Sequence, residues 1–202
     1  VKTNLPIRDI CVSKNGVVAA VLDDSDVTRI LLYNGNTDTE TSIVDIKASM
    51  DKSGYPMSLS LSPNGKLLAI SYFYVDEGDM KSTVAFFNFD EVGKNESDNY
   101  VSGYNYAGAV VPYVQFMSNS AAFAVSDDRI IFIQGSENPS NVASNFIKEE
   151  IQTIYYNENY VGLVFRNQTG ESIYRLDVYD TGGNKIHSQF FDIEYTDIIF
   201  NK

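Results

Sequence analysis

The stretch ICVSKNGVVAAVLD, from Ile10 to Asp23, places two apolar segments on either side of the turn SKNG. Asn-Gly supplies the positive φ angles that a tight hairpin turn requires, and the Ser hydroxyl can bond nearby backbone. The same arrangement returns three times, as LSLSPNGKLLAISY from Leu59, VQFMSNSAAFAVSD from Val114 and TIYYNENYVGLVFR from Thr153. A β-hairpin repeated in this way predicts an all-β chain folded as a β-propeller of WD40-like blades.

The spacing of the four hairpins agrees with that of propeller blades. Successive copies lie about 40 to 55 residues apart, and a four-stranded blade takes roughly 40 to 50 residues. The predicted blades cover residues 7–48, 56–110, 113–149 and 151–192, and residues 195–201 read as the first strand of a fifth blade.

We therefore expect a single domain over residues 1–202 that holds about four blades and forms part of a larger propeller. Propellers carry up to about eight blades, and an unclosed ring exposes sheet edges that favour association. An edge-to-edge homodimer is the alternative to further blades.

The composition excludes several classes of partner and site. A net charge of −12 disfavours nucleic acid and anionic lipid, and no run approaches the ~18 apolar residues of a membrane helix. Cys11 is the only cysteine and His187 the only histidine, so a zinc site cannot be completed. His187 lies on a predicted outer strand, far from Cys11, which argues against a nucleophile activated by histidine.

Acidic and glycine-rich turns are the remaining chemical candidates. Acidic groups occur where hairpins must turn, and the weak calcium candidates among them are Asp76, Glu77 and Asp79. The turn Asp180–Gly183 resembles that of quinoprotein repeats, but the chain has no Trp to dock it, so no cofactor is expected. A glycosidase or lyase site at the channel is an alternative, with acids from Asp9, Glu150 and Asp197.

Two segments depart from a bare blade, the acidic connection Val75–Lys81 and the inserted stretch Asp90–Tyr106. Because loops on a rigid frame carry recognition, we expect the interaction surface there, with tyrosine anchors and an acidic rim that favours basic or neutral partners. The predicted surface residues are Tyr74, Asp76, Glu77, Asp79, Tyr100, Tyr104 and Tyr106.

Nearly the whole chain resembles an uncharacterised propeller-like family of Gram-positive bacteria, domain of unknown function 5711. The resemblance is carried by Ser53–Phe116, most specifically by Phe87–Tyr106, and by the motifs LPI at Leu5, SDDR at Ser126 and YYNE at Tyr155. It implies a parent protein anchored by an N-terminal membrane helix, with the propeller outside the cell. It supplies no catalytic residues.

Taken together, these observations predict a non-enzymatic extracytoplasmic module that binds a protein or an envelope component. The alternatives are the carboxylate enzyme and a purely structural spacer.

Overall fold

The computed structural model describes residues 4–24, 27–35, 38–43, 54–88, 100–107, 111–134, 140–146, 150–166 and 173–192. Within these ranges the chain forms sixteen β-strands, joined into four antiparallel sheets of four strands each. Each sheet consists of four strands that are consecutive in the sequence and adjacent in space. This arrangement confirms the predicted all-β architecture of repeated four-stranded units.

The strands of the first two sheets begin and end as follows. Sheet 1 contains β1 (Ile7–Val12), β2 (Val17–Asp24), β3 (Val27–Asn34) and β4 (Thr39–Ile43). Sheet 2 contains β5 (Gly54–Leu61), β6 (Leu67–Asp76), β7 (Asp79–Asn88) and β8 (Tyr100–Ala107).

On average, the strands of sheet 3 are the shortest of the four sheets. Sheet 3 contains β9 (Tyr113–Phe116), β10 (Ala121–Val125), β11 (Arg129–Gln134) and β12 (Ser140–Asn145). Sheet 4 contains β13 (Glu150–Tyr156), β14 (Tyr160–Arg166), β15 (Tyr174–Asp180) and β16 (Lys185–Phe191).

One predicted connection is wrong in an informative way. The acidic loop expected at Val75–Lys81 is a continuation of β6 and β7, in which Val75 pairs with Met80. Only two residues turn the chain, Glu77 at φ 52° and Gly78 at φ 88°. Two successive positive φ angles match the right-handed twist of the flanking strands, so a two-residue turn suffices. The inserted stretch 90–99 and the predicted strand 195–201 lie outside the described residues.

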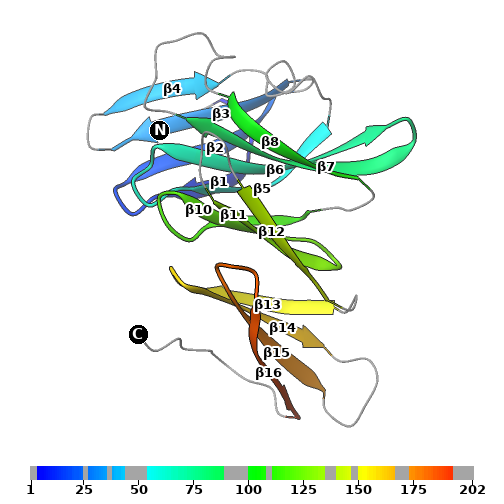
Figure 1. The fold of residues 1–202 in the computed structure, drawn as a ribbon. Coiled ribbons are helices and arrows are strands. Elements are labelled where there is room, and N and C mark those ends of the chain that lie inside the picture. The colour runs from blue at the N-terminus through cyan, green and yellow to red at the C-terminus, as the bar shows by residue number, and fades with distance from the viewer. Residues whose placement is uncertain are drawn as a thin grey trace.

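The four sheets pack face to face in chain order, from sheet 1 at the top of Figure 1 to sheet 4 at the bottom. One apolar core joins sheets 1 and 2 through residues such as Val21 and Ile70. A second joins sheets 2 and 3 through Phe86 and Phe116, and a third joins sheets 3 and 4. The near-continuous apolar runs of β2, β6, β10 and β14 follow from this stacking, because both faces of these strands are buried.

Side-chain hydroxyls connect sheet 2 to sheet 3 inside the packed region. The backbone N–H of Phe116 donates to Ser60 Oγ at 2.9 Å, and that of Val111 donates to Ser82 Oγ at 3.0 Å. Ser71 Oγ in turn donates to the carbonyl of Val111. Buried backbone groups between the two sheets are thereby paired, as burial requires.

A charged cluster on β15 lies inside the contact between sheets 3 and 4. Asp177 is fully buried, and its Oδ2 lies 3.2 Å from Arg175 Nε and 3.6 Å from Lys185 Nζ. Ser188 Oγ donates to the other carboxylate oxygen at 2.6 Å. The Arg175 guanidinium stacks on the ring of Phe165, 4.6 Å from its centroid.

The turn after β15 completes the same contact. Gln134 of sheet 3 donates to the carbonyl of Thr181, and Ser144 donates to that of Gly183. Gly183 has a φ of 79°, and a Cβ there would lie 2.8 Å from Val142 Cγ1. The lack of a side chain at Gly183 therefore lets this turn pack closely against sheet 3.

Replacement of the buried carboxylate tests the charged cluster. We expect Asp177→Ala to lower the free energy of unfolding by about 3 kcal/mol or more, because it removes the buried carboxylate that pairs with Arg175 and Lys185. Asp79→Ala, at an exposed turn, should stay within about 0.5 kcal/mol of wild type. Urea unfolding of both variants measures the difference, and equal losses would show that the cluster is not a special source of stability.

Candidate functional site

The first turn of each sheet borders a concavity of about 900 Å³, which we call the mouth. It takes residues from all four sheets, so its shape depends on the stack as a whole. Its lining consists of Val12, Ser13, Lys14, Leu61, Pro63, Gln115, Phe116, Met117, Tyr156, Asn157, Glu158, Asn159 and Tyr160.

A recurring side-chain acceptor closes each of these turns. The backbone N–H of Val17 donates to Ser13 Oγ at 2.9 Å, and that of Leu67 donates to Ser62 Oγ at 3.0 Å. In the third turn Ser118 Oγ accepts from Ala121 N–H, and in the fourth Asn157 Oδ1 accepts from Tyr160 N–H. These local bonds fix the turns that the repeated sequence predicted.

The turns are also bonded to one another around the mouth. Asn15 Nδ2 donates to the carbonyl of Asn64 at 2.6 Å, and Asn64 N–H donates to Asn119 Oδ1 at 2.9 Å. Lys14 Nζ and Glu158 lie 3.7 Å apart, which brings the first and fourth turns together. Both side chains of this pair are largely exposed, so it adds little stability and mainly sets the charge of the rim.

Aromatic rings of sheet 3 support Tyr156, which lines the mouth. Tyr156 packs on Phe123 with ring centroids 5.6 Å apart, and Phe123 packs on Tyr113 at 5.8 Å. Burial raises the pKa of Tyr156, and burial together with Tyr156 raises that of Tyr113 to about 12. Both hydroxyls therefore remain neutral hydrogen-bonding groups at physiological pH.

The described lining suits a neutral ligand better than a charged one. Its only ions are Lys14 and Glu158, which pair with each other. The remaining polar groups are amides, hydroxyls and backbone, set among apolar side chains such as Leu61 and Met117. Pockets of this type bind through apolar contact and orient the ligand with a few hydrogen bonds.

The sequence-predicted surface lies elsewhere. Asp76, Glu77 and Asp79 are at the tip of the β6–β7 hairpin, whereas Tyr74 is buried in the core between sheets 1 and 2. Tyr100, Tyr104 and Tyr106 are on β8, where their backbones pair with Phe87, Val84 and Ser82. The structure therefore groups these residues within sheet 2, and none of them belongs to the described lining of the mouth.

The predicted acidic turns make local contacts. Asp76 Oδ2 accepts a hydrogen bond from Lys81 Nζ at 2.8 Å, which raises the pKa of Lys81. Across the described residues, no three His, Cys, Asp or Glu side chains gather as a metal ion would need. Calcium binding at Asp76, Glu77 and Asp79 stays a prediction.

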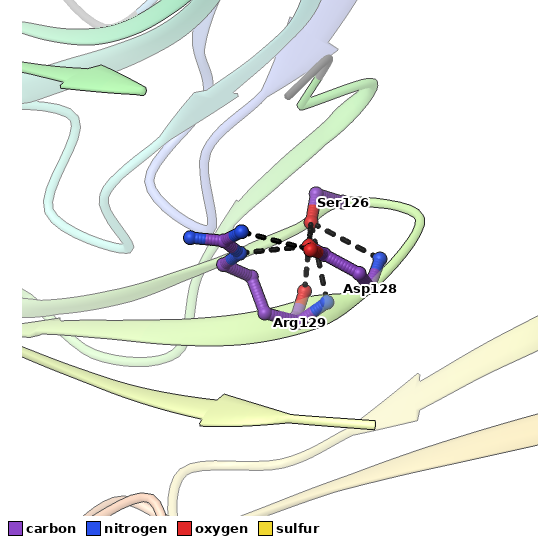
Figure 2. A network of polar contacts seen from close by, with 3 residues as sticks. All are labelled: Ser126, Asp128 and Arg129. Carbon is purple, nitrogen blue, oxygen red and sulfur yellow. Dashed lines mark hydrogen bonds and ion pairs between the residues drawn. The ribbon is translucent and has the colours of Figure 1, made fainter. Parts of the chain in front are cut away.

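The turn between β10 and β11 holds the polar network of Figure 2, in which Ser126 and Arg129 converge on Asp128. Arg129 donates from Nε to Oδ1 at 2.7 Å and from Nη2 to Oδ2 at 2.8 Å. Ser126 Oγ donates to Asp128 Oδ1 at 2.9 Å. Asp128 thus accepts hydrogen bonds from Ser126 and Arg129, as expected of a residue that stabilises a turn.

The described acids and the histidine considered for catalysis come from sheets 1 and 4. Asp9 is on β1 of sheet 1 and accepts from the N–H of Ile10, and Glu150 begins β13 of sheet 4. Asp197 lies outside the described residues. His187 is exposed on β16, the outermost strand of sheet 4, where its Nε2 lies 3.4 Å from Gln189 Oε1. Cys11 is half-buried against the core of sheets 1 and 2.

The sequence analysis did not predict the mouth, although it used the spacing of the four turns to place the blades. The recurring Ser and Asn residues indicated where each hairpin turned. They did not show that all four turns would border one concavity, because this follows from the stacking of sheets far apart in sequence.

The part of the chain that the structure describes contains no helix with the length and hydropathy of a membrane crossing. A family model described only as a family of unknown function (DUF5711) matches residues 1–202. No protein with a curated description matches the sequence.

Solved β-propeller structures share the fold. The Cps50 (Swd1) β-propeller domain of Myceliophteria thermophila is 13% identical with a TM-score of 0.57, over 93% of this chain and 56% of that one. A eukaryotic initiation factor is 12% identical with a TM-score of 0.55, over 94% of this chain and 56% of that one. An acylaminoacyl peptidase is 12% identical with a TM-score of 0.55, and the match covers 93% of this chain and 32% of that one. This chain therefore spans about half the length of the first two, and the likeness concerns the fold alone.

Two turn glycines offer a matched test of how the turns pack. Both have positive φ, 83° at Gly16 and 70° at Gly65, but a Cβ at Gly16 meets nothing within 4 Å. A Cβ at Gly65 would lie 2.6 Å from Val17 Cγ2 of the neighbouring sheet. We expect Gly16→Ala to cost about 1 kcal/mol of stability, since it adds only backbone strain, and Gly65→Ala to cost more. Equal losses in thermal unfolding would contradict the close contact between these turns.

The buried thiol gives a second test. Burial raises the pKa of Cys11 to about 12, so the thiolate is scarce in the folded chain. Near pH 8 we expect alkylation by iodoacetamide to be at least about tenfold slower in the folded chain than in urea. Similar rates in the two states, followed by mass spectrometry, would place Cys11 in open solvent.

Proposed function

The chain belongs to the family of unknown function DUF5711, and we propose that it serves there as a non-enzymatic recognition module. Its partner is another protein or a cell-envelope component, held at the mouth. We further propose that it acts outside the cytoplasm, as part of a parent protein that a membrane helix anchors. The support for this location is the sequence resemblance described above.

One observation carries the choice of site. The mouth is the concavity to which all four sheets contribute, and bonds between neighbouring turns hold its rim. A rim fixed in this way loses little conformational freedom on binding, which favours affinity. A converging lining whose only ions pair with each other favours binding over carboxylate chemistry.

The lining also defines the contact that we propose. Tyr156 and Tyr160 are the anchors, because tyrosine combines a large apolar surface with a polar tip. Gln115, Asn157 and Asn159 offer amide groups to the main chain or hydroxyls of the partner. Lys14 and Glu158 neutralise each other, so the partner segment is uncharged where it enters.

The tip of the β6–β7 hairpin is the competing surface. Glu77 and Asp79 are exposed at the turn, Asp76 is partly exposed and paired with Lys81, and this acidic tip would favour a basic partner. The two surfaces predict different effects of salt: binding at the acidic tip weakens as salt is added, whereas binding at the mouth does not.

Affinity capture from a cell-envelope extract tests the proposal, with the immobilised chain as bait. The mouth variant is Tyr160→Ala with Asn159→Ala. The matched control is Tyr55→Ala, an exposed tyrosine on β5 that stacks with Arg8 outside the described lining of the mouth. A third variant, Asp76→Asn, Glu77→Gln and Asp79→Asn, removes the charge of the tip.

We expect the mouth variant to lower the affinity for the captured partner at least about tenfold, and the control to leave it unchanged. Loss in the tip variant alone would move the site to the β6–β7 hairpin. If wild type retains neither protein nor glycan, the recognition proposal is wrong.

A further inference from the structure

The first strands of sheets 2 and 3 are connected by side chains that cap main-chain groups. In an antiparallel pair, residues that bond across the ladder alternate with residues whose N–H and C=O point away from it. In β9 the residues of the second kind are Val114 and Phe116. Their N–H groups donate to Ser58 Oγ at 3.2 Å and to Ser60 Oγ at 2.9 Å. The edge of β9 that points away from β10 is therefore capped by the sheet that precedes it.

A similar contact joins sheets 1 and 2. Leu61 holds in β5 the place that Phe116 holds in β9, because each directly precedes the residue whose N–H closes its turn. The Leu61 main chain lies against Cys11 of β1. Burial raises the pKa of Cys11 to about 12, and a hydrogen bond from the Leu61 main chain partly opposes this rise. In both sheets, then, a side chain of the preceding sheet pairs this N–H.

Tyr156 holds the corresponding place in β13 of sheet 4. The N–H of Asn157 closes the fourth turn onto the carbonyl of Tyr160, so the next pair of the ladder, Tyr156 with Val161, does not bond across it. The N–H and C=O of Tyr156 therefore point away from β14. Tyr156 is 42% exposed and lines the mouth.

No described residue of sheet 3 caps these two groups. Gln115 stands in β9 where Ser60 stands in β5, but its Nε2 donates to the carbonyl of Phe116 in its own strand at 3.2 Å. Tyr113 stands where Ser58 does, and its ring packs within sheet 3. Each replaces a short hydroxyl side chain by a long one that is engaged elsewhere. The described part of the chain thus leaves the edge of β13 open at the mouth.

We propose that this edge receives an extended peptide segment of the partner, which adds to sheet 4 as a strand beside β13. The inference rests on the proposed function, since it states what the partner presents at the mouth. A strand offers a C=O and an N–H at the spacing that the Tyr156 N–H and C=O require. Lys14 and Glu158 pair with each other, so the segment is uncharged. Leu61 and Met117 offer apolar contacts to its side chains.

A set of modified peptides tests the pairing from the side of the ligand. The probe is a peptide selected on the immobilised chain from a synthetic library of short uncharged sequences. Each residue is then N-methylated in turn, which removes one main-chain N–H and keeps the side chain. We expect the affinity to fall at least about tenfold at alternate residues only, since a strand bonds to its neighbour through every second residue. Losses without alternation, or no loss at any residue, overturn strand addition.

Two variants of one residue test the pairing from the side of the protein. Tyr156→Pro and Tyr156→Ala both remove the ring, but only proline removes the N–H, which a residue at the outward side of an edge strand can lose. We expect the proline variant to bind the selected peptide at least about tenfold more weakly than the alanine variant. Equal affinities of the two folded variants contradict the proposal. If thermal unfolding shows that the proline variant does not fold, the N-methylated peptides decide.

The failure of this inference differs from the failure of the proposed function. Suppose that affinity capture retains a partner that Tyr160→Ala with Asn159→Ala loses, but that this partner is a glycan or that the library yields no binding peptide. The mouth is then a recognition site, and strand addition is wrong. If affinity capture with the wild type retains nothing, the proposed function is wrong and this inference fails with it.

Discussion

Apolar side chains on both faces of the central strands are the constraint on which this fold depends. A sheet of this kind cannot leave either face in water, so it must be covered by a neighbour on each side. Ala19, Ala69 and Ala124 are fully buried in the strands that carry most of this packing. Their small side chains let adjacent sheets come close, while Leu, Ile and Phe at neighbouring positions fill the space between them. The position of the mouth follows from this stacking, because stacking brings the four turns together.

The apolar faces determine how the sheets stack, and polar side chains then fix the turns and pair the buried backbone groups. Serine and asparagine side chains close the turns and connect them, and serine hydroxyls pair the buried backbone between sheets 2 and 3. Sheet 4 instead buries a carboxylate, Asp177, with two cations from its own strands β15 and β16. Because a buried carboxylate is costly to leave unpaired, Arg175 and Lys185 compensate Asp177 within this sheet.

The local part of this architecture could be predicted from the sequence, and the distant part could not. The four hairpins were placed correctly because Asn-Gly turns and apolar alternation act over a few residues. The loop predicted at Val75–Lys81 failed because acidic residues resemble a loop, although Glu77 and Gly78 alone can turn the chain. Strand β12 begins at Ser140, in a segment of little apolar character, and backbone pairing with β11 holds it in place. The mouth depends on contacts between turns about fifty residues apart, which periodicity does not encode.

The stacking of sheets 1 to 4 in chain order has a mechanical consequence. The described cores link each sheet to the next one, so cooperativity passes along a line, as in a row of coupled repeats. In such a system a sheet that shares cores with a sheet on each side opens after one that shares a core on a single side. Sheets 2 and 3 would thus exchange their amide hydrogens last. The turns around the mouth would differ in local stability in the same way. The second and third turns would open rarely, and the first and fourth, where Lys14 meets Glu158, would open more often.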